Sequence, residues 1–214
     1  MTAHAEVHVH HDPPAVVARR DRMGVVLLIV ADIAFVLCLM FTYLYLRFLN
    51  VNGLWLPEEV TPAQAGMTWI VIAALFVGAV VFSIGLRALR SGNRSAYVSA
   101  AAVAFVIAVV AAVLQWMQLA NFGFPAAENG YFASAYSSTM VTLAAANLFH
   151  LILTVFISLG LFTRGVMGKV TSDAPWQAQL GRLWWIWVTV SAFLVGLMTT
   201  FYVYTPYPPS IPSM

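Results

Sequence analysis

The chain has 214 residues, of which 62% are apolar or aromatic and only 8% are charged, and its mean hydropathy is +0.86. Soluble domains carry charge on about a quarter of their residues, so this composition excludes a water-soluble fold and indicates an all-α, polytopic membrane protein. The chain has no basic stripe of the kind that binds nucleic acid, and its single cysteine, Cys38, excludes an internal disulfide and a cysteine-ligated metal centre within this chain.

Five apolar runs are long enough to cross about 30 Å of hydrocarbon as helices. We expect the transmembrane spans at residues 23–46, 67–86, 96–119, 139–163 and 183–204. The sequence therefore predicts three parts, which are a polar, flexible tail (1–22), a domain of five transmembrane helices (23–205) and a proline-rich tail (206–214).

The basic residues predict the orientation of these spans. Nine of the ten lie before the first span, between the second and third, or between the fourth and fifth, and only Arg47 lies on the other side. The positive-inside rule therefore predicts a cytoplasmic N-terminus and an outer C-terminus. Trp184, Trp185 and Trp187 begin the last span, where we expect them to form an aromatic belt at the inner interface.

Two ionisable side chains lie within the spans. Asp32 is the only acidic residue in any span, and His150 is the only histidine outside the polar N-terminal tail. Asn147, His150, Thr154 and Ser158 share one helical face by their spacing, and we hypothesise that this face turns toward the first helix, with His150 within hydrogen-bonding reach of Asp32. Two interpretations stay open for this pair, a proton, ion or polar-lipid site, or a hydrogen-bonded contact that only joins two helices.

Other polar and small residues in the spans predict helix packing. Gln115 and Gln118 lie one turn apart in the third span, where their amides are expected to bond to a neighbouring helix. Alanines recur every fourth residue in the same span, which favours close helix approach. With a single membrane histidine and no cysteine pair, the chain is predicted to hold no haem, copper or other redox metal itself.

The first span carries a family resemblance. Residues 30–47 read V-A-D-I-A-F-V-L-C-L-M-F-T-Y-L-Y-L-R, which resembles the first conserved helix of subunit III of the haem-copper (cytochrome c type) terminal oxidases. In that family an acidic residue opens the run and Tyr-x-Tyr-Leu-Arg closes it, so Asp32 falls on the family's glutamate and Arg47 on its final arginine.

Further motifs extend the resemblance over residues 22–204. Residues 88–94 (A-L-R-S-G-N-R), the pair Leu114-Gln115 and the segment that opens with Tyr136 are similar to family motifs in the same order, and His150 falls on the second histidine of the family's His-x-x-His. The chain thus resembles the short, five-helix bacterial form, which lacks the first helix pair of longer members.

The sequence departs from the family at several polar positions. Asn147 stands where the family has its first histidine, Gln118 replaces a common glutamate, and Ile186 and Thr189 replace a histidine and an aspartate of the last helix. Asp32 is one methylene shorter than the family's glutamate. Each departure removes charge or reach from the interior of the bundle.

The resemblance implies a non-catalytic core subunit of a respiratory oxidase in the bacterial plasma membrane. Its expected partners are a haem-bearing subunit I and a copper-bearing subunit II, with a small subunit IV or a larger respiratory supercomplex as further partners. Its expected roles are to stabilise subunit I and to support proton uptake and the access of lipid and oxygen, with bound phospholipid as the expected ligand. The side chains expected to contact lipid or other subunits are Arg47, Arg87, Arg90, Gln115, Trp116 and Tyr136.

Three other functions stay open. A subunit III-like accessory protein of a nitric oxide reductase would fit the lost histidine and acids. A small proton-coupled transporter would use Asp32 and His150 as a relay, although the sequence shows no inverted repeat. A purely structural anchor of another membrane complex is the third.

Overall fold

The computed structural model describes residues 13–50, 55–125 and 134–204. Within these ranges the chain forms five α-helices and no strand, and each helix is long and apolar enough to cross a membrane. The helices are α1 (Pro14–Leu49), α2 (Ala65–Arg90), α3 (Arg94–Ala120), α4 (Ala135–Val166) and α5 (Trp176–Phe201). The predicted all-α, five-helix membrane fold is therefore confirmed.

Helix α1 begins well before the predicted first span. It starts at Pro14, so residues 14–22 are helical although the sequence predicted a flexible tail there. Proline is favoured in the first turn of a helix, and the alanine, arginine and valine residues that follow contain no helix breaker. The four tail histidines and the predicted tail 206–214 lie outside the described residues.

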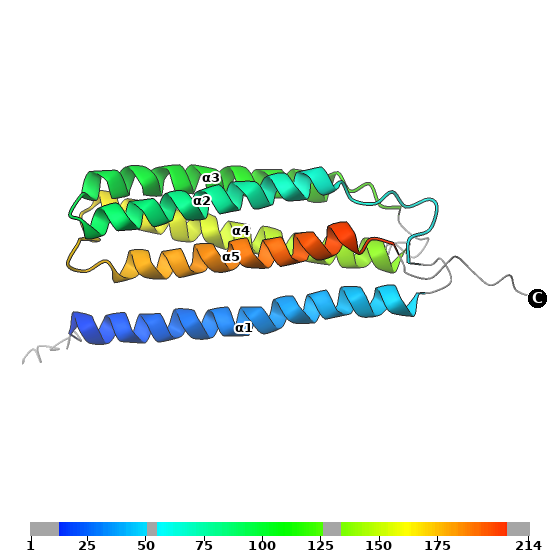
Figure 1. Cartoon of the computed structure of the whole chain (residues 1–214), viewed down its shortest axis with the longest axis horizontal. Helices are drawn as coiled ribbons and strands as arrows, with labels where there is room; N and C mark the ends of the chain where they lie inside the picture. Colours follow the sequence, from blue (N-terminus) through cyan, green and yellow to red (C-terminus); the bar gives the residue numbers. More distant parts are fainter. Residues whose placement is uncertain (1–12, 51–54, 126–133, 205–214) are drawn as a thin grey trace, which may run out of the picture.

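The five helices run side by side along the long axis of the molecule (Figure 1). Helices α2 and α3 form one side, joined by a turn in which Gly92 adopts a φ of 85°. Helix α1 lies on the opposite side. Of the other four helices in the part of the chain that the structure describes, it packs only against α4 and α5. Most of its surface therefore faces away from the rest of the chain.

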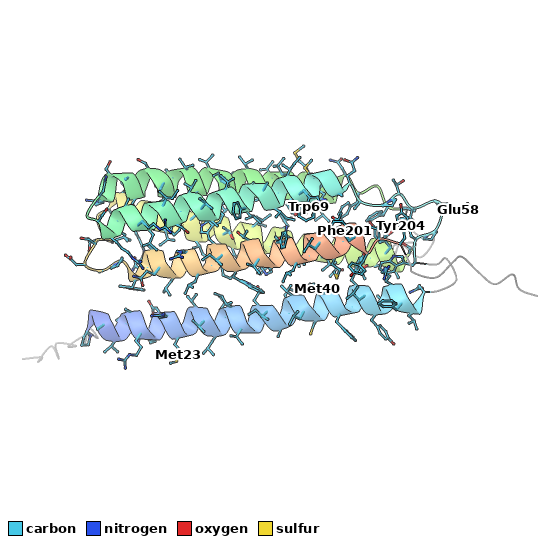
Figure 2. All side chains as sticks on the ribbon, viewed as in Figure 1. Met23, Met40, Glu58, Trp69, Phe201 and Tyr204 are labelled. Carbon is cyan, nitrogen blue, oxygen red and sulfur yellow. The ribbon has the colours of Figure 1, made fainter. Side chains whose placement is uncertain are left out.

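The main core lies where α2, α3, α4 and α5 meet. Leu75, Phe82 and Tyr97 are fully buried there, together with alanines of α3. Gly78 lets α2 approach α5 closely, because a Cβ atom at this position would lie only 2.6 Å from Cζ3 of Trp185. Figure 2 shows the complementary outer surface, where apolar side chains such as Met23 point away from the bundle, as expected for contact with lipid.

A second core lies at the end of the bundle where α1 stops. Tyr43, Trp55 and Tyr136 pack edge to face and are fully buried. Three donors bind successive carbonyl groups just after α5: the Tyr43 hydroxyl donates to Tyr202, the Trp55 indole to Val203 and the Arg47 guanidinium to Tyr204. We call residues 43, 47 and 55 with the segment 202–204 the C-terminal clasp. The clasp ties the end of the last helix to the end of the first.

Candidate functional site

A polar cluster lies at the middle of the bundle, where α1, α4 and α5 meet. Asp32 is 18 residues past the first residue of α1 and 17 before its last. His150 is 15 residues into α4, with 16 beyond it, and Trp187 is likewise near the middle of α5. At 1.5 Å of rise per residue, each helix places its residue about 20 Å or more from at least one end. The cluster therefore lies deep in the membrane-spanning part.

Both carboxylate oxygens of Asp32 have a partner. Nε2 of His150 lies 3.0 Å from Oδ1, and the indole Nε1–H of Trp187 donates to Oδ2 at 2.5 Å. The His150 side chain is 4% exposed and that of Asp32 is 16% exposed. The contact between Asp32 and His150 that the sequence predicts is confirmed, and it is direct.

These contacts explain how the chain tolerates an acid at this depth. An aspartate near the centre of a membrane helix costs roughly 2.5–3.5 kcal/mol on insertion scales. Two donors on neighbouring helices offset that cost, because hydrogen bonds to a charged group are stronger than neutral ones. The Trp184 ring packs edge-on against the imidazole at 6.2 Å between centroids and restricts its orientation.

The cluster can exist in two charge states. Protonated His150 and ionised Asp32 form a neutral ion pair, whereas neutral His150 donates Nε2–H to a carboxylate that keeps its negative charge. The difference between the two states is one proton.

A hollow approaches the cluster from one end of the bundle. Its volume is about 330 Å³, and α1, α4 and α5 line it. Asp21, Arg164 and Gln177 lie near the helix ends at its mouth, whereas Leu28 and Trp184 lie one helical turn short of Asp32 and Trp187. Polar groups thus surround the outer part of the hollow, and apolar side chains separate its inner part from the carboxylate.

The polar face of α4 contacts three helices, not α1 alone as the sequence predicted. Only His150 reaches α1, whereas Thr154 and Ser158 accept hydrogen bonds from the indoles of Trp184 and Trp185 at 2.9 and 3.2 Å. Asn147 instead donates to the amide of Gln115 on α3 at 2.6 Å. Along this face, Asn147 thus contacts α3, His150 contacts α1, and the last two residues contact α5.

Of the four tryptophans of α5, the three predicted to form an interfacial belt, Trp184, Trp185 and Trp187, do not form one. Trp184 and Trp185 are buried, and all three indole N–H groups donate to side chains within the bundle. The expectation was wrong because α5 begins at Trp176, seven residues before the predicted span, so Trp187 lies about 16 Å inside the helix. One chemical signal could have indicated the contact between Trp187 and Asp32. An indole N–H in hydrocarbon needs an acceptor, and the second carboxylate oxygen of Asp32 had no predicted partner.

A chain of amides joins α2, α3 and α4 nearer the other end. Asn147 donates to Gln115, Gln115 donates to Gln118 at 3.1 Å, and Gln118 donates to the Thr68 hydroxyl at 2.8 Å. The chain borders a small cavity of about 30 Å³. The prediction that Gln115 and Gln118 bond to neighbouring helices is confirmed.

The remaining predicted contact residues differ in their exposure. Arg47, Gln115 and Tyr136 are buried, and each makes a hydrogen bond within the chain, such as the one that the Tyr136 hydroxyl accepts from the backbone N–H of Ala63 at 2.9 Å. Nε of Arg47 is buried without a partner. The expected contact of these side chains with lipid or another subunit stays a prediction. Trp116, at 61% exposed, lies on the outer surface with Arg87 and Arg90.

No group of three or more His, Cys, Asp or Glu side chains within residues 13–50, 55–125 and 134–204 is placed to hold a metal ion. The fold and the cluster together define a multi-pass α-helical membrane protein with a buried carboxylate–imidazole–indole site. Comparison with models of protein families finds none that matches the chain. A search of curated proteins also finds no similar sequence.

Proposed function

We propose that the chain is the non-catalytic core subunit III of a bacterial haem-copper respiratory oxidase. One observation carries the proposal. The resemblance assigns a carboxylate to Asp32 and a histidine to His150 from two separate motifs, and these two residues, 118 positions apart, lie within 3.0 Å of each other. The two motifs of the resemblance thus supply the two side chains of one buried contact.

The proposed role of the cluster is to supply protons to the haem-bearing subunit. The proposal rests on the direct contact between Asp32 and His150 in the middle of the bundle and on the hollow beside Asp21 and Arg164, which approaches this pair to within one helical turn. By the positive-inside rule the mouth of this hollow faces the cytoplasm, the side from which such oxidases take up protons.

The proposed seat of the haem-bearing subunit is the outer side of α1. Among the helices of the described residues, α1 packs only against α4 and α5. It exposes large apolar side chains such as Leu27, Phe35 and Phe41 along its length. The haem-bearing subunit would in turn contact the other proposed partners, which are the copper-bearing subunit, any small fourth subunit and any supercomplex partner. The haems and copper would belong to those partners.

The experiment that tests the proposal is gentle solubilisation of the native membrane, capture of this chain and a visible spectrum of what accompanies it. Co-purified a-type haem and copper, with oxygen consumption, are expected. Haem b and haem c with nitric oxide turnover would replace the oxidase by a nitric oxide reductase. A preparation without any chromophore would contradict both assignments.

The alternative of a proton-coupled transporter has a structural difficulty. Such proteins place their sites at discontinuous helices, whereas α1, α4 and α5 run unbroken past Asp32, His150 and Trp187. Reconstituted alone in vesicles, the chain is expected to carry no solute-dependent proton flux. A substrate-dependent flux would favour the transporter.

A further inference from the structure

A hollow at one end of the bundle is lined by four arginines. Its volume is about 530 Å³, and the arginines are Arg19 and Arg22 of α1, Arg90 of α2 and Arg182 of α5. The start of α1, the end of α2 and the start of α5 all lie at this end of the bundle (Figure 1). We call this cavity the basic hollow. Three helices therefore bring four positive charges to one cavity.

The four charges have no counter-charge in the basic hollow. No acidic side chain lines it. Among the described residues, no hydrogen bond or ion pair joins these guanidinium groups to the rest of the chain, and Nε of Arg182 is buried without a partner. Like charges in one cavity repel each other, and a buried donor without an acceptor costs free energy. An anion in the basic hollow would remove both costs.

The donors around the basic hollow suit phosphate groups. Guanidinium groups bind phosphate oxygens through pairs of parallel hydrogen bonds. Trp176, the first residue of α5, also lines the hollow, and the residue before it, Pro175, provides no capping side chain for the helix. The N-terminus of a helix favours negative charge, so an anion there would also benefit from the first turn of α5.

The number and position of the arginines favour a soluble anion with several charges. The phosphodiester of a lipid headgroup carries a single negative charge, so it would compensate only one of the four arginines. A chain of linked phosphates carries several charges and more acceptor oxygens. All four arginines also lie just outside the predicted spans 23–46, 67–86 and 183–204, so that an anion can reach them from water.

We propose that the basic hollow binds a soluble polyphosphate, the class of anion that includes nucleoside triphosphates and inorganic tripolyphosphate. Its linked phosphates would lie among the four guanidinium groups, beside the first turn of α5. By the positive-inside rule this end of the bundle is predicted to face the cytoplasm, where such anions occur. The proposal rests on the basic hollow and not on the oxidase assignment, so the two can fail separately.

Isothermal titration calorimetry of the purified chain in uncharged dodecyl maltoside micelles tests the proposal, with sodium tripolyphosphate as the probe. One tripolyphosphate is expected to bind per chain, and more tightly than orthophosphate at the same ionic strength. The variant Arg90→Gln/Arg182→Gln is expected to bind it about 25-fold more weakly, from about a fivefold loss for each arginine. Tripolyphosphate should also raise the thermal unfolding temperature of the unmodified chain, because a ligand of the folded state stabilises it.

The matched control is Arg164→Gln/Lys169→Gln, which removes two positive charges from exposed positions at the same end of the bundle but outside the basic hollow. Its affinity for tripolyphosphate should equal that of the unmodified chain. A second pair, Arg19→Gln/Arg22→Gln, serves if Arg90→Gln/Arg182→Gln does not fold. Both of its positions are exposed on α1, and glutamine is a good helix former, so the fold should persist while binding weakens to a similar extent.

Several outcomes would overturn the proposal. Equal affinity for tripolyphosphate and orthophosphate would remove the need for several linked charges. Unchanged tripolyphosphate binding in either arginine pair would place the anion elsewhere, and an equal loss in the control would show nonspecific attraction to a basic surface. A lipid headgroup also carries phosphate, so a few equivalents of dioleoyl phosphatidylglycerol per chain are added in a further titration. They should leave tripolyphosphate binding unchanged, and displacement would assign the basic hollow to lipid instead.

Discussion

Replacing His150 by leucine removes one of the two partners of Asp32 and leaves the carboxylate with the Trp187 indole alone. Removing one partner of a buried ion pair costs about 3–5 kcal/mol, because the other charge stays behind uncompensated. Asp32 is 16% exposed and keeps one donor, so the lower end applies, at about 3 kcal/mol. Asp32→Leu leaves only a neutral imidazole without its acceptor and should cost about 1–2 kcal/mol.

The double variant Asp32→Leu/His150→Leu distinguishes an ion pair from a neutral hydrogen bond. It removes both polar groups and should lie within about 1 kcal/mol of the unmodified chain, because replacing a whole buried pair by apolar groups is often neutral. The coupling energy of the cycle is then about 3–5 kcal/mol. Neutral hydrogen bonds between membrane helices average only about 0.6 kcal/mol, with a maximum near 1.7 kcal/mol.

The assay is unfolding in mixed micelles with an increasing fraction of dodecyl sulfate, followed by helical circular dichroism. A control cycle uses Ser158→Ala and Trp185→Phe, which break a neutral hydrogen bond between α4 and α5, two of the three helices that form the cluster. That cycle should give about 0.6 kcal/mol. A coupling for Asp32 and His150 no larger than the control would refute an ionised pair, and additive single variants would refute the interaction itself.

Three further predictions concern the cluster and the core. Trp187→Phe removes the indole donor to Asp32 and should destabilise the chain by about 1.5 kcal/mol in the same unfolding assay, whereas a loss of only about 0.6 kcal/mol would contradict an ionised acceptor. Gly78→Ala places a Cβ atom 2.6 Å from the rigid ring of Trp185 and should cost about 1–3 kcal/mol, whereas Gly66→Ala, with no atom within 4 Å, should be harmless; equal effects would contradict this packing. In the proposed oxidase, Asp32→Asn should lower turnover at high pH while the complex still assembles, and oxygen consumption unchanged across pH would leave the residue a packing role only.

The number and approximate position of the helices could be predicted because hydrocarbon requires long, continuous apolar runs, although α1 and α5 begin earlier than their predicted spans. The pairing of Asp32 with His150 could be predicted for a related reason. A lone acid and a lone imidazole at similar depth each need a partner, and few other partners exist in the membrane.

The rotation of α5 about its axis could not be predicted. Nearly every face of this helix is apolar or aromatic, so hydropathy does not distinguish the side that faces α1 from the side that faces lipid. Trp187 was therefore assigned to the interface although its indole binds Asp32. The hollow lined by Arg22, Arg90 and Arg182 could not be predicted either, because these residues come from three segments of the sequence and lie close together only in the folded bundle.

The C-terminal clasp has a consequence for how the chain is made. The groups that seat the end of α1 are carbonyls of residues 202–204, which are synthesised after all five described helices. Helix α1 must therefore wait in the membrane without its final neighbours while the rest of the bundle is inserted. Its apolar circumference suits that interval, since lipid can solvate it until α5 arrives. The contacts that hold the end of α1 can thus form only after α5 has been synthesised.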